Sequence, residues 1–127
     1  MNLAMYHSLI RKSRLSILVK GQDPMSEMYG IFKPEYSPSA SINIKVLDAI
    51  AKFDRIVITG QAKSHCVMES VIQMLDYYKN DTKTIKKIFI LEDTMSIIPS
   101  FEDTTNKAFD DFRNRSVNLV TTKDFSL

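Results

Sequence analysis

Hydrophobic residues in this sequence fall into two patterns: short continuous runs, and longer stretches with apolar positions three and four residues apart. The runs are typical of buried strands, and the spaced stretches are typical of helices with one buried face. The runs predict strands at residues 15–19, 55–59, 87–92 and 117–121. The spaced stretches predict helices at residues 3–13, 65–79 and 101–113, and a helix that Ser39 or Ser41 caps and that runs through Phe53.

The alternation of strands and helices predicts the topology of the sheet. Strands separated by helices pair in parallel through right-handed crossovers, which favours a three-layer α/β/α fold with a parallel sheet. A chain of 127 residues can bury a core, so residues 1–127 are expected to form one domain. A long connection follows the strand at 15–19, and long connections often carry function. Four residues break regular structure within it: Pro24, Gly30, Pro34 and Pro38.

Composition and charge argue against several classes of function. The net charge of +2 is too small to indicate nucleic-acid binding, and the lysines within 83–87 lack interleaved aromatic residues, so a solvated loop is expected there. No stretch approaches the roughly 18 apolar residues of a membrane helix, and the first residues do not resemble a signal peptide. The single cysteine excludes an intramolecular disulfide and suits a reducing compartment, so a cytoplasmic location is expected.

The only cysteine stands where a strand is predicted to turn into a helix. A thiol at a helix N-terminus is stabilised as the thiolate by unpaired N–H groups and by the helix dipole, which makes Cys66 a candidate nucleophile. Gly60 favours a tight turn before it, and Ser64 can cap the helix. The carboxyl edge of a parallel sheet is also where open α/β folds bind ligands. The alternative is that Cys66 is a small buried hydrophobe, as lone cysteines commonly are.

Two segments of the chain carry a recognisable pattern. Residues 60–67 read Gly-Gln-Ala-Lys-Ser-His-Cys-Val, and residues 19–24, Val-Lys-Gly-Gln-Asp-Pro, are followed by Tyr-Gly-Ile-Phe at 29–32. The first segment resembles the Gly-x-Ala-x-x-x-Cys-Val nucleophile loop of the isochorismatase-like cysteine hydrolases, a Rossmann-like family that includes the nicotinamidases. The second is similar to that family's Lys-Gly segment and its downstream Tyr-Ser-x-Phe. Both occur in the family's order, and the resemblance covers most of residues 15–123.

The resemblance implies a set of site residues. Cys66 would be the nucleophile, and Lys20 would be the cation that favours its thiolate. The backbone N–H groups of Ala62 and Cys66 would form the oxyanion hole, and the peptide bond between Gln61 and Ala62 would be cis. Three side chains would line the substrate pocket: Tyr29, Phe32 and Gln61. The two aromatic residues among them are at least as often packing anchors.

The resemblance is incomplete in the N-terminal part of the family pattern. The family's catalytic aspartate and its metal ligands, an Asp and histidines, have no counterpart here, because His7 and His65 are the only histidines. The chain thus resembles the C-terminal portion of such a hydrolase, lacking the first two strands of a sheet ordered 3-2-1-4-5-6. No cofactor is expected in this chain, and a divalent metal such as Zn²⁺ would be held only in a full-length member. The strand at 15–19 is expected to be displaced, to pair with the exposed edge of the sheet, or to lie beside a gap in it.

His65 and Asp93 are the residues that invite a role as the missing base. Adjacent side chains at a helix start point in different directions, so His65 is not expected to pair with Cys66. Asp93 ends a buried strand, and it is expected to cap the following turn.

The function implied by the resemblance is the hydrolysis of nicotinamide to nicotinate and ammonia through a thioester on Cys66. Other family members act on other amides, N-carbamoyl compounds or isochorismate, and these substrates stay open. A non-catalytic α/β remnant or interaction module that keeps only the Lys20 and Cys66 half-site is the alternative. The expected partner is a small-molecule amide, without nucleic acid or membrane, and a homo-oligomer stays open.

Overall fold

A parallel sheet of three strands forms the centre of the protein. The computed structural model describes residues 6, 9–12, 14–36 and 41–126. The strands β1 (Ile56–Ile58), β2 (Ile88–Leu91) and β3 (Asn118–Val120) lie side by side in that order, and both pairings are parallel. The predicted α/β fold with a parallel sheet, and the pairing of these three strands, are therefore confirmed.

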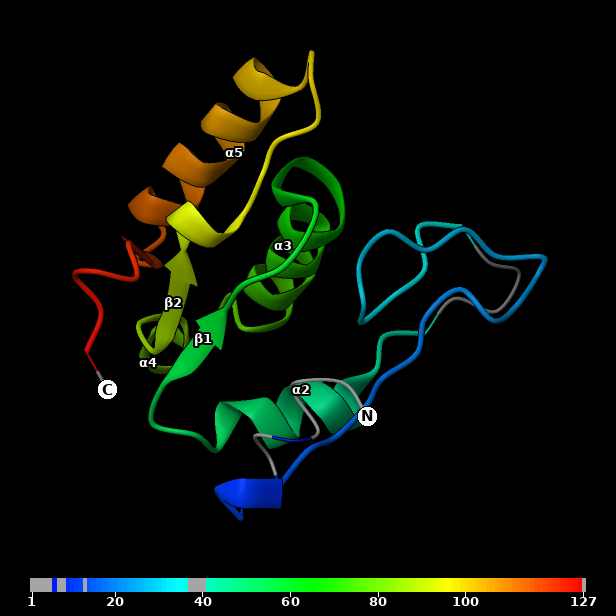
Figure 1. Ribbon diagram of the computed structural model, residues 1–127. Coiled ribbons are helices and arrows are strands. Elements are labelled where there is room, and N and C mark those ends of the chain that lie inside the picture. The colour runs from blue at the N-terminus through cyan, green and yellow to red at the C-terminus, as the bar shows by residue number, and fades with distance from the viewer. Residues whose placement is uncertain (1–5, 7–8, 13, 37–40, 127) are drawn as a thin grey trace.

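Helices connect the strands and cover them (Figure 1). In chain order they are α2 (Ile44–Ala51), the π-helical turn η1 (Lys63–Val67), α3 (Met68–Tyr77), α4 (Thr82–Ile85), the 3₁₀ turn η2 (Glu92–Thr94) and α5 (Glu102–Asn114). Helices α3 and α5 contact each other, and α5 also contacts η1. Helix α2 lies against the C-terminal end of α3, where the Tyr78 hydroxyl donates to the Leu47 carbonyl at 2.6 Å.

The core forms between β2 and the two long helices. Along β2, Ile88 and Ile90 are buried and alternate with half-buried residues, so the strand has one core face. The side chains that complete this cluster from α3 and α5 include Val71, Met74, Leu75, Phe109 and Phe112. On the other face of β2, the ring of Phe89 lies 5.4 Å from that of Phe125, so the C-terminal segment covers part of it. The buried side chains of β2 therefore fix the sheet against helices α3 and α5.

The segment at 15–19 is not a strand, which corrects the prediction from its apolar run. Its residues are exposed, and β1 pairs with β2 alone among the described segments. An apolar run becomes a strand only where a neighbour takes its backbone N–H and C=O groups, and no described strand does so here. Of the three arrangements expected for this segment, pairing with the edge of the sheet is excluded, and among the described residues β1 is an edge strand.

The helix before β1 begins and ends at other residues than predicted. Asn43 caps α2, because its side chain accepts from the N–H of Val46 at 3.3 Å. Ser41 precedes that cap, and Ser39 lies outside the described residues. The helix ends at Ala51 instead of running through Phe53.

Other local predictions also differ from the structure. The helix predicted at 65–79 starts earlier, as η1. The helix predicted at 101–113 is α5, which begins at Glu102 because Phe101 is its N-cap, without a side-chain bond. Residues 82–85, expected in a solvated loop, form α4 because Asp81 caps them through the N–H of Thr84. The helix predicted at 3–13 lies largely outside the described residues.

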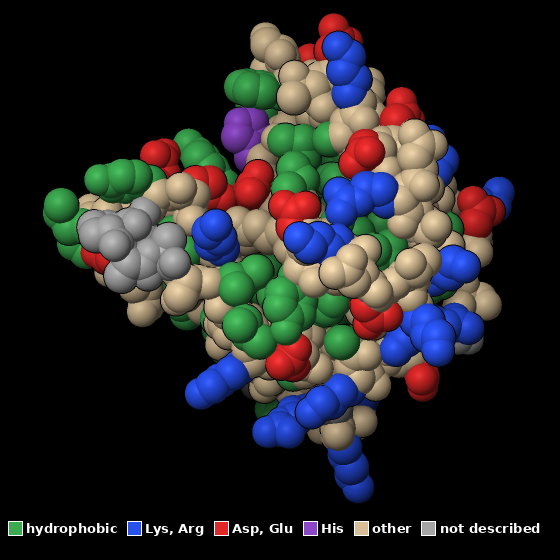
Figure 2. All heavy atoms as spheres, turned by 180° about the vertical axis from the view of Figure 1, so that it is seen from behind, with side chains coloured by type: hydrophobic (Ala, Val, Ile, Leu, Met, Phe, Trp, Pro, Cys, Tyr) green, Lys and Arg blue, Asp and Glu red, His purple; other side chains and the backbone are tan. Residues whose placement is uncertain are grey.

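Side chains of both charges are interspersed on the face that Figure 2 shows. Hydrophobic side chains also reach the surface there, between the charged groups. Within the described part of the chain, no helix combines the length and the apolar character that a bilayer crossing needs.

Candidate active site

The segment that carries the cysteine follows β1 at the carboxyl edge of the sheet. Gly60 has a φ of 147°, a conformation that residues with side chains rarely adopt, and the bond between Gln61 and Ala62 is cis, as the resemblance implied. The Ala62 carbonyl then accepts from the N–H groups of His65 and Val67, both at 3.2 Å, which opens η1. Neither bond uses the N–H of Cys66. The oxyanion role of the Ala62 and Cys66 N–H groups stays a prediction.

The structure brings together Lys20 and Cys66, which are 46 positions apart in the chain. Lys20 Nζ lies 3.2 Å from Cys66 Sγ and donates to it. The same ammonium donates to the Met28 carbonyl at 3.3 Å and to the Tyr29 carbonyl. Three acceptors match the three N–H groups of an ammonium, so the cation is held against the sulfur. The positive charge of Lys20 therefore lies directly beside the cysteine that the resemblance makes the nucleophile.

Tyr29 lies on the long connection, on the same side as the thiol. Its hydroxyl donates to Glu27 Oε1 at 2.9 Å, and this bond, with the charge of Glu27, raises the pKa of Tyr29. The hydroxyl is therefore protonated at neutral pH and remains a donor. Its ring centroid lies 6.3 Å from that of His65, and with Phe101 these rings line a cavity of about 200 Å³. A role for Tyr29 in substrate binding stays a prediction.

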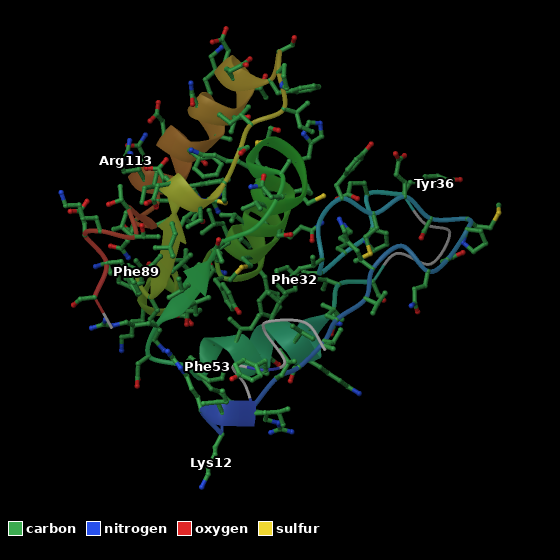
Figure 3. All side chains as sticks on the ribbon, viewed as in Figure 1. Lys12, Phe32, Tyr36, Phe53, Phe89 and Arg113 are labelled. Atoms are coloured by element: carbon green, nitrogen blue, oxygen red, sulfur yellow. The ribbon has the colours of Figure 1, made fainter. Side chains whose placement is uncertain are left out.

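Phe32 and Gln61 make other contacts in the structure. Phe32 is only 2% exposed and lies between the long connection and the helices (Figure 3), so it is a core residue. The Gln61 side chain accepts from the N–H of Ser96 at 3.1 Å and donates to the Thr94 carbonyl at 3.4 Å. Gln61 thus ties the nucleophile segment to the residues after β2. Whether either side chain also contacts substrate stays a prediction.

Among the residues that the structure describes, no carboxylate forms a hydrogen bond or ion pair with Lys20 or Cys66. Asp93 accepts instead from the N–H and the hydroxyl of Thr122, at 2.9 and 2.5 Å. His65 Nδ1 shares a hydrogen bond of 2.9 Å with the Ser64 hydroxyl. Neither candidate base is therefore bonded to the thiol. The expectation that Asp93 caps the turn after its strand is corrected, because its partner is Thr122 in the C-terminal segment. In the same way Ser64 is buried and accepts from Ile98, which corrects its predicted role as a helix cap.

The described residues do not offer a metal site. No three His, Cys, Asp or Glu side chains among them are grouped so that they could hold a metal ion.

Three polar residues near the pair were missed by sequence reasoning: Lys63, Ser70 and Gln73. Lys63 forms an ion pair of 3.0 Å with Glu92 and lies 4.4 Å from the ring centroid of Phe109, so it joins the start of η1 to η2 and α5. Ser70 and Gln73 hydrogen-bond to the long connection. Their spacing from Cys66, four and then three residues, is the signal that could have placed them on one helix face with the thiol.

Replacement of Asp93 by Asn is expected to lower stability at neutral pH but not at strongly acidic pH. The two bonds from Thr122 hold the pKa of Asp93 below its usual value of 3.8, because both favour the carboxylate. Such a group adds stability above its unfolded pKa and loses that contribution as the pH falls through the folded value. Urea midpoints at pH 7 and in acid should therefore differ between Asp93→Asn and wild type only at pH 7. A difference that grows toward low pH would contradict this account.

The fold of the chain is similar to that of a solved yeast nicotinamidase, in agreement with the fold that the resemblance implied. The solved structure of the yeast nicotinamidase Pnc1p matches with a TM-score of 0.62 and 19% sequence identity, over 92% of this chain and 50% of that chain. The same yeast enzyme bound to the inhibitor nicotinaldehyde matches with a TM-score of 0.63 and 18% identity, over 94% of this chain and 50% of that chain.

The chain spans about half the length of these yeast structures. No protein-family profile matches the sequence, and no curated protein matches it either. At this level of identity the similarity establishes the fold, and the chemistry must be argued from the site.

Proposed function

We propose that the protein is a cysteine-dependent amide hydrolase of the nicotinamidase type. The observation that carries the proposal is the 3.2 Å contact between Lys20 Nζ and Cys66 Sγ at the carboxyl edge of the sheet. An ammonium that two backbone carbonyls hold against a cysteine sulfur would stabilise the negative charge of a thiolate nucleophile. The similarity in fold to a yeast nicotinamidase supports nicotinamide as the first substrate to examine.

The reaction would begin with attack of the Cys66 thiolate on the carboxamide carbon. The carbonyl oxygen becomes an oxyanion, which the backbone N–H groups of Ala62 and Cys66 would stabilise. Collapse of this intermediate breaks the C–N bond, and the nitrogen leaves as ammonia once it takes up a proton. Water then attacks the thioester on Cys66, which releases the carboxylic acid and restores the thiol.

The proton transfers need a group that the described residues do not place at the pair. A carboxylate could reach it from a further strand along the open edge of β1, where a cavity of about 420 Å³ is lined by apolar residues that include Phe53, Ile56 and Met74. Parallel sheets are normally covered and continued on such sides.

A second candidate is a non-catalytic remnant or interaction module. The absence of a bonded carboxylate at Lys20 and Cys66 among the described residues favours it. The two candidates differ in whether the thiol still adds to a carbonyl carbon.

Nicotinaldehyde tests the proposal without requiring turnover. Addition of a thiolate to an aldehyde forms a C–S bond and an oxyanion that is then protonated, and no leaving group has to depart. The 127-residue chain is therefore expected to form a thiohemiacetal, seen by ¹³C NMR of nicotinaldehyde labelled at its carbonyl carbon. Cys66→Ser should abolish the adduct signal.

Benzaldehyde is the matched control ligand, because it lacks the ring nitrogen. Benzaldehyde addition that is weaker than nicotinaldehyde addition by more than the two aldehydes differ with a free thiol would support a nicotinamide-like substrate. A difference no larger than that would point to another amide. If wild type forms no adduct with either aldehyde, the hydrolase proposal fails and the non-catalytic candidate is favoured.

A further inference from the structure

Two buried polar side chains continue the helix face on which Cys66 lies. Ser70 is 8% exposed and Gln73 is 7% exposed. Burial of polar groups is costly unless they form hydrogen bonds, so their partners show what the two residues do. All of those partners lie either at Cys66, on α3 or on the long connection that supplies the acceptors for Lys20.

Ser70 joins the nucleophile to the connection through one hydroxyl. Its Oγ donates to the Cys66 carbonyl at 2.6 Å and accepts from the N–H of Ile31 at 3.2 Å. The position of Ile31 is therefore fixed relative to the backbone of Cys66.

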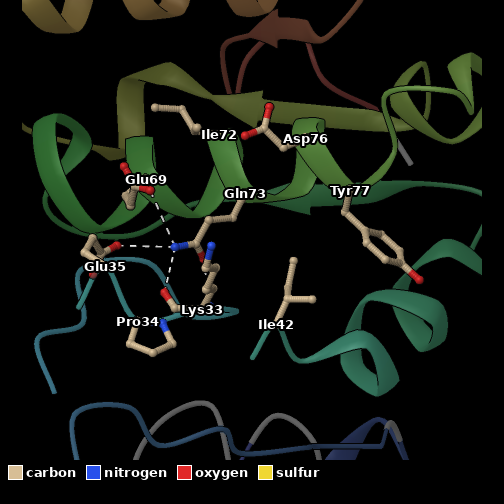
Figure 4. A pocket seen from close by; sticks show the side chains of 9 residues that line it. All are labelled: Lys33, Pro34, Glu35, Ile42, Glu69, Ile72, Gln73, Asp76 and Tyr77. Carbon is tan, nitrogen blue, oxygen red and sulfur yellow. Dashed lines mark hydrogen bonds between the residues drawn. The ribbon is translucent and has the colours of Figure 1, made fainter. Parts of the chain in front are cut away.

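Gln73 binds the next part of the connection with its whole amide (Figure 4). Its Oε1 accepts from the N–H groups of Phe32 and Lys33, at 3.1 and 3.0 Å. Its Nε2 donates to the Lys33 carbonyl at 2.7 Å and to Glu35 Oε1 at 3.3 Å. One side chain thus holds the backbone of two residues and orients the carboxylate of a third.

Glu35 carries this order back to the acceptors of Lys20. Its carboxylate accepts from the N–H of Tyr29 at 2.5 Å and from the N–H of Gly30 at 3.0 Å. The carbonyl of Tyr29 is one of the two that hold the Lys20 ammonium. The loop passes so close to Gln73 at Gly30 that only glycine fits, because a Cβ at that position would overlap the amide of Gln73.

We propose that Gln73 and Ser70 are positioning residues that hold Lys20 against Cys66 through the loop at 28–35. The inference rests on the proposed function, since it concerns the same pair of residues. Neither residue contacts the thiol through its side chain, and both act by fixing the backbone carbonyls on which the ammonium rests. The loop is therefore part of the arrangement that holds the ammonium of Lys20 at the sulfur of Cys66.

The test measures the rate at which iodoacetamide alkylates Cys66 at pH 7, in the full 127-residue chain. This readout follows the thiolate population and requires no amide substrate. Lys20→Met is expected to lower the rate about tenfold, the size expected when a close cation is lost. Gln73→Leu removes the amide that holds the loop at 28–35, and Gly30→Ala places a Cβ against that amide. Both variants are expected to lower the alkylation rate by a large part of that factor.

A double-mutant cycle separates positioning from general loss of structure. In the Lys20→Met background, Gln73→Leu should cause no further loss, because the residue acts through Lys20. Ser70→Ala should lower the rate and Ser70→Thr, which keeps the hydroxyl, should restore most of it. Ser70→Ala removes only one oxygen atom, so the test remains usable if Gln73→Leu does not fold.

Thr84→Val is the matched control, because Thr84 is buried and its hydroxyl donates to Asp81 on α4. It should lower the thermal midpoint and leave the alkylation rate unchanged. A wild-type alkylation rate in folded Gln73→Leu and Ser70→Ala, or equal losses with and without Lys20, would overturn the inference. If nicotinaldehyde fails to add while the cycle behaves as expected, the proposed function is contradicted, and the positioning role of Gln73 and Ser70 still holds.

Discussion

As the 127-residue chain alone, the protein is expected to release ammonia from nicotinamide at least about a thousandfold more slowly than the yeast nicotinamidase assayed in parallel. The structure places Lys20 against Cys66, and no described carboxylate is bonded to either residue. The sulfur and a neighbouring cation are therefore in place, but the proton that must reach the leaving nitrogen has no assigned donor among the described residues. A coupled ammonia assay with Cys66→Ser as the blank measures the difference.

Rapid ammonia release that Cys66→Ser abolishes would contradict this expectation. It would mean that a carboxylate of this chain moves to the thiol when substrate binds. Glu27 and Glu35 are the first to replace by Gln, because both act on Tyr29 beside the pair. Rapid release that survives in Cys66→Ser would instead assign the activity to a contaminating enzyme.

Phe112→Ala is expected to destabilise the protein by about 3–5 kcal/mol, the cost of emptying a large, closed core position. Phe112 is 1% exposed, and its ring lies 5.1 Å from that of Phe109 within the cluster beneath β2. Phe109 also contacts the Lys63 ammonium, so this cluster supports the start of η1 that carries Cys66. Urea unfolding followed by circular dichroism measures the loss.

Phe53→Ala provides the matched control for this loss, because the same atoms are removed from a residue that is 63% exposed. Its effect is expected to stay within about 0.5 kcal/mol. Equal losses for Phe53→Ala and Phe112→Ala would show that the core is not centred on the cluster beneath β2.

The three strands that form the sheet could be predicted because their signal is local. Runs such as Ile88–Leu91 are apolar over the length of a strand, and the helix that follows β1 shows its buried face by spacing. The same reasoning fails at 15–19, where a run that is apolar except at Ser16 is exposed and pairs with no described strand. The difference is that a strand also needs a neighbour for its backbone groups, and the run itself does not show whether one is present.

The candidate site divides in the same way. The position of Cys66 at the turn from strand to helix could be predicted, because the apolar patterns on either side of this cysteine are local in the sequence. The contact with Lys20 came only from a family resemblance, since nothing local relates residues 46 positions apart. Ser64, predicted as a cap, instead accepts from Ile98 across the fold. Gln73 lay unnoticed because its partners are backbone groups, which carry no mark in a sequence.

By itself the sequence determined which segments are strands or helices in most of the chain, and where the only thiol lies. These properties follow from the period of apolar residues and from the chemistry of one side chain, which neighbours along the chain suffice to set. The tertiary structure decided that Lys20 reaches Cys66, that Asp93 is bound to Thr122, and that Gln73 holds the loop between them. Those outcomes depend on distances between segments remote in sequence, which only packing of the helices against the sheet and the connection establishes.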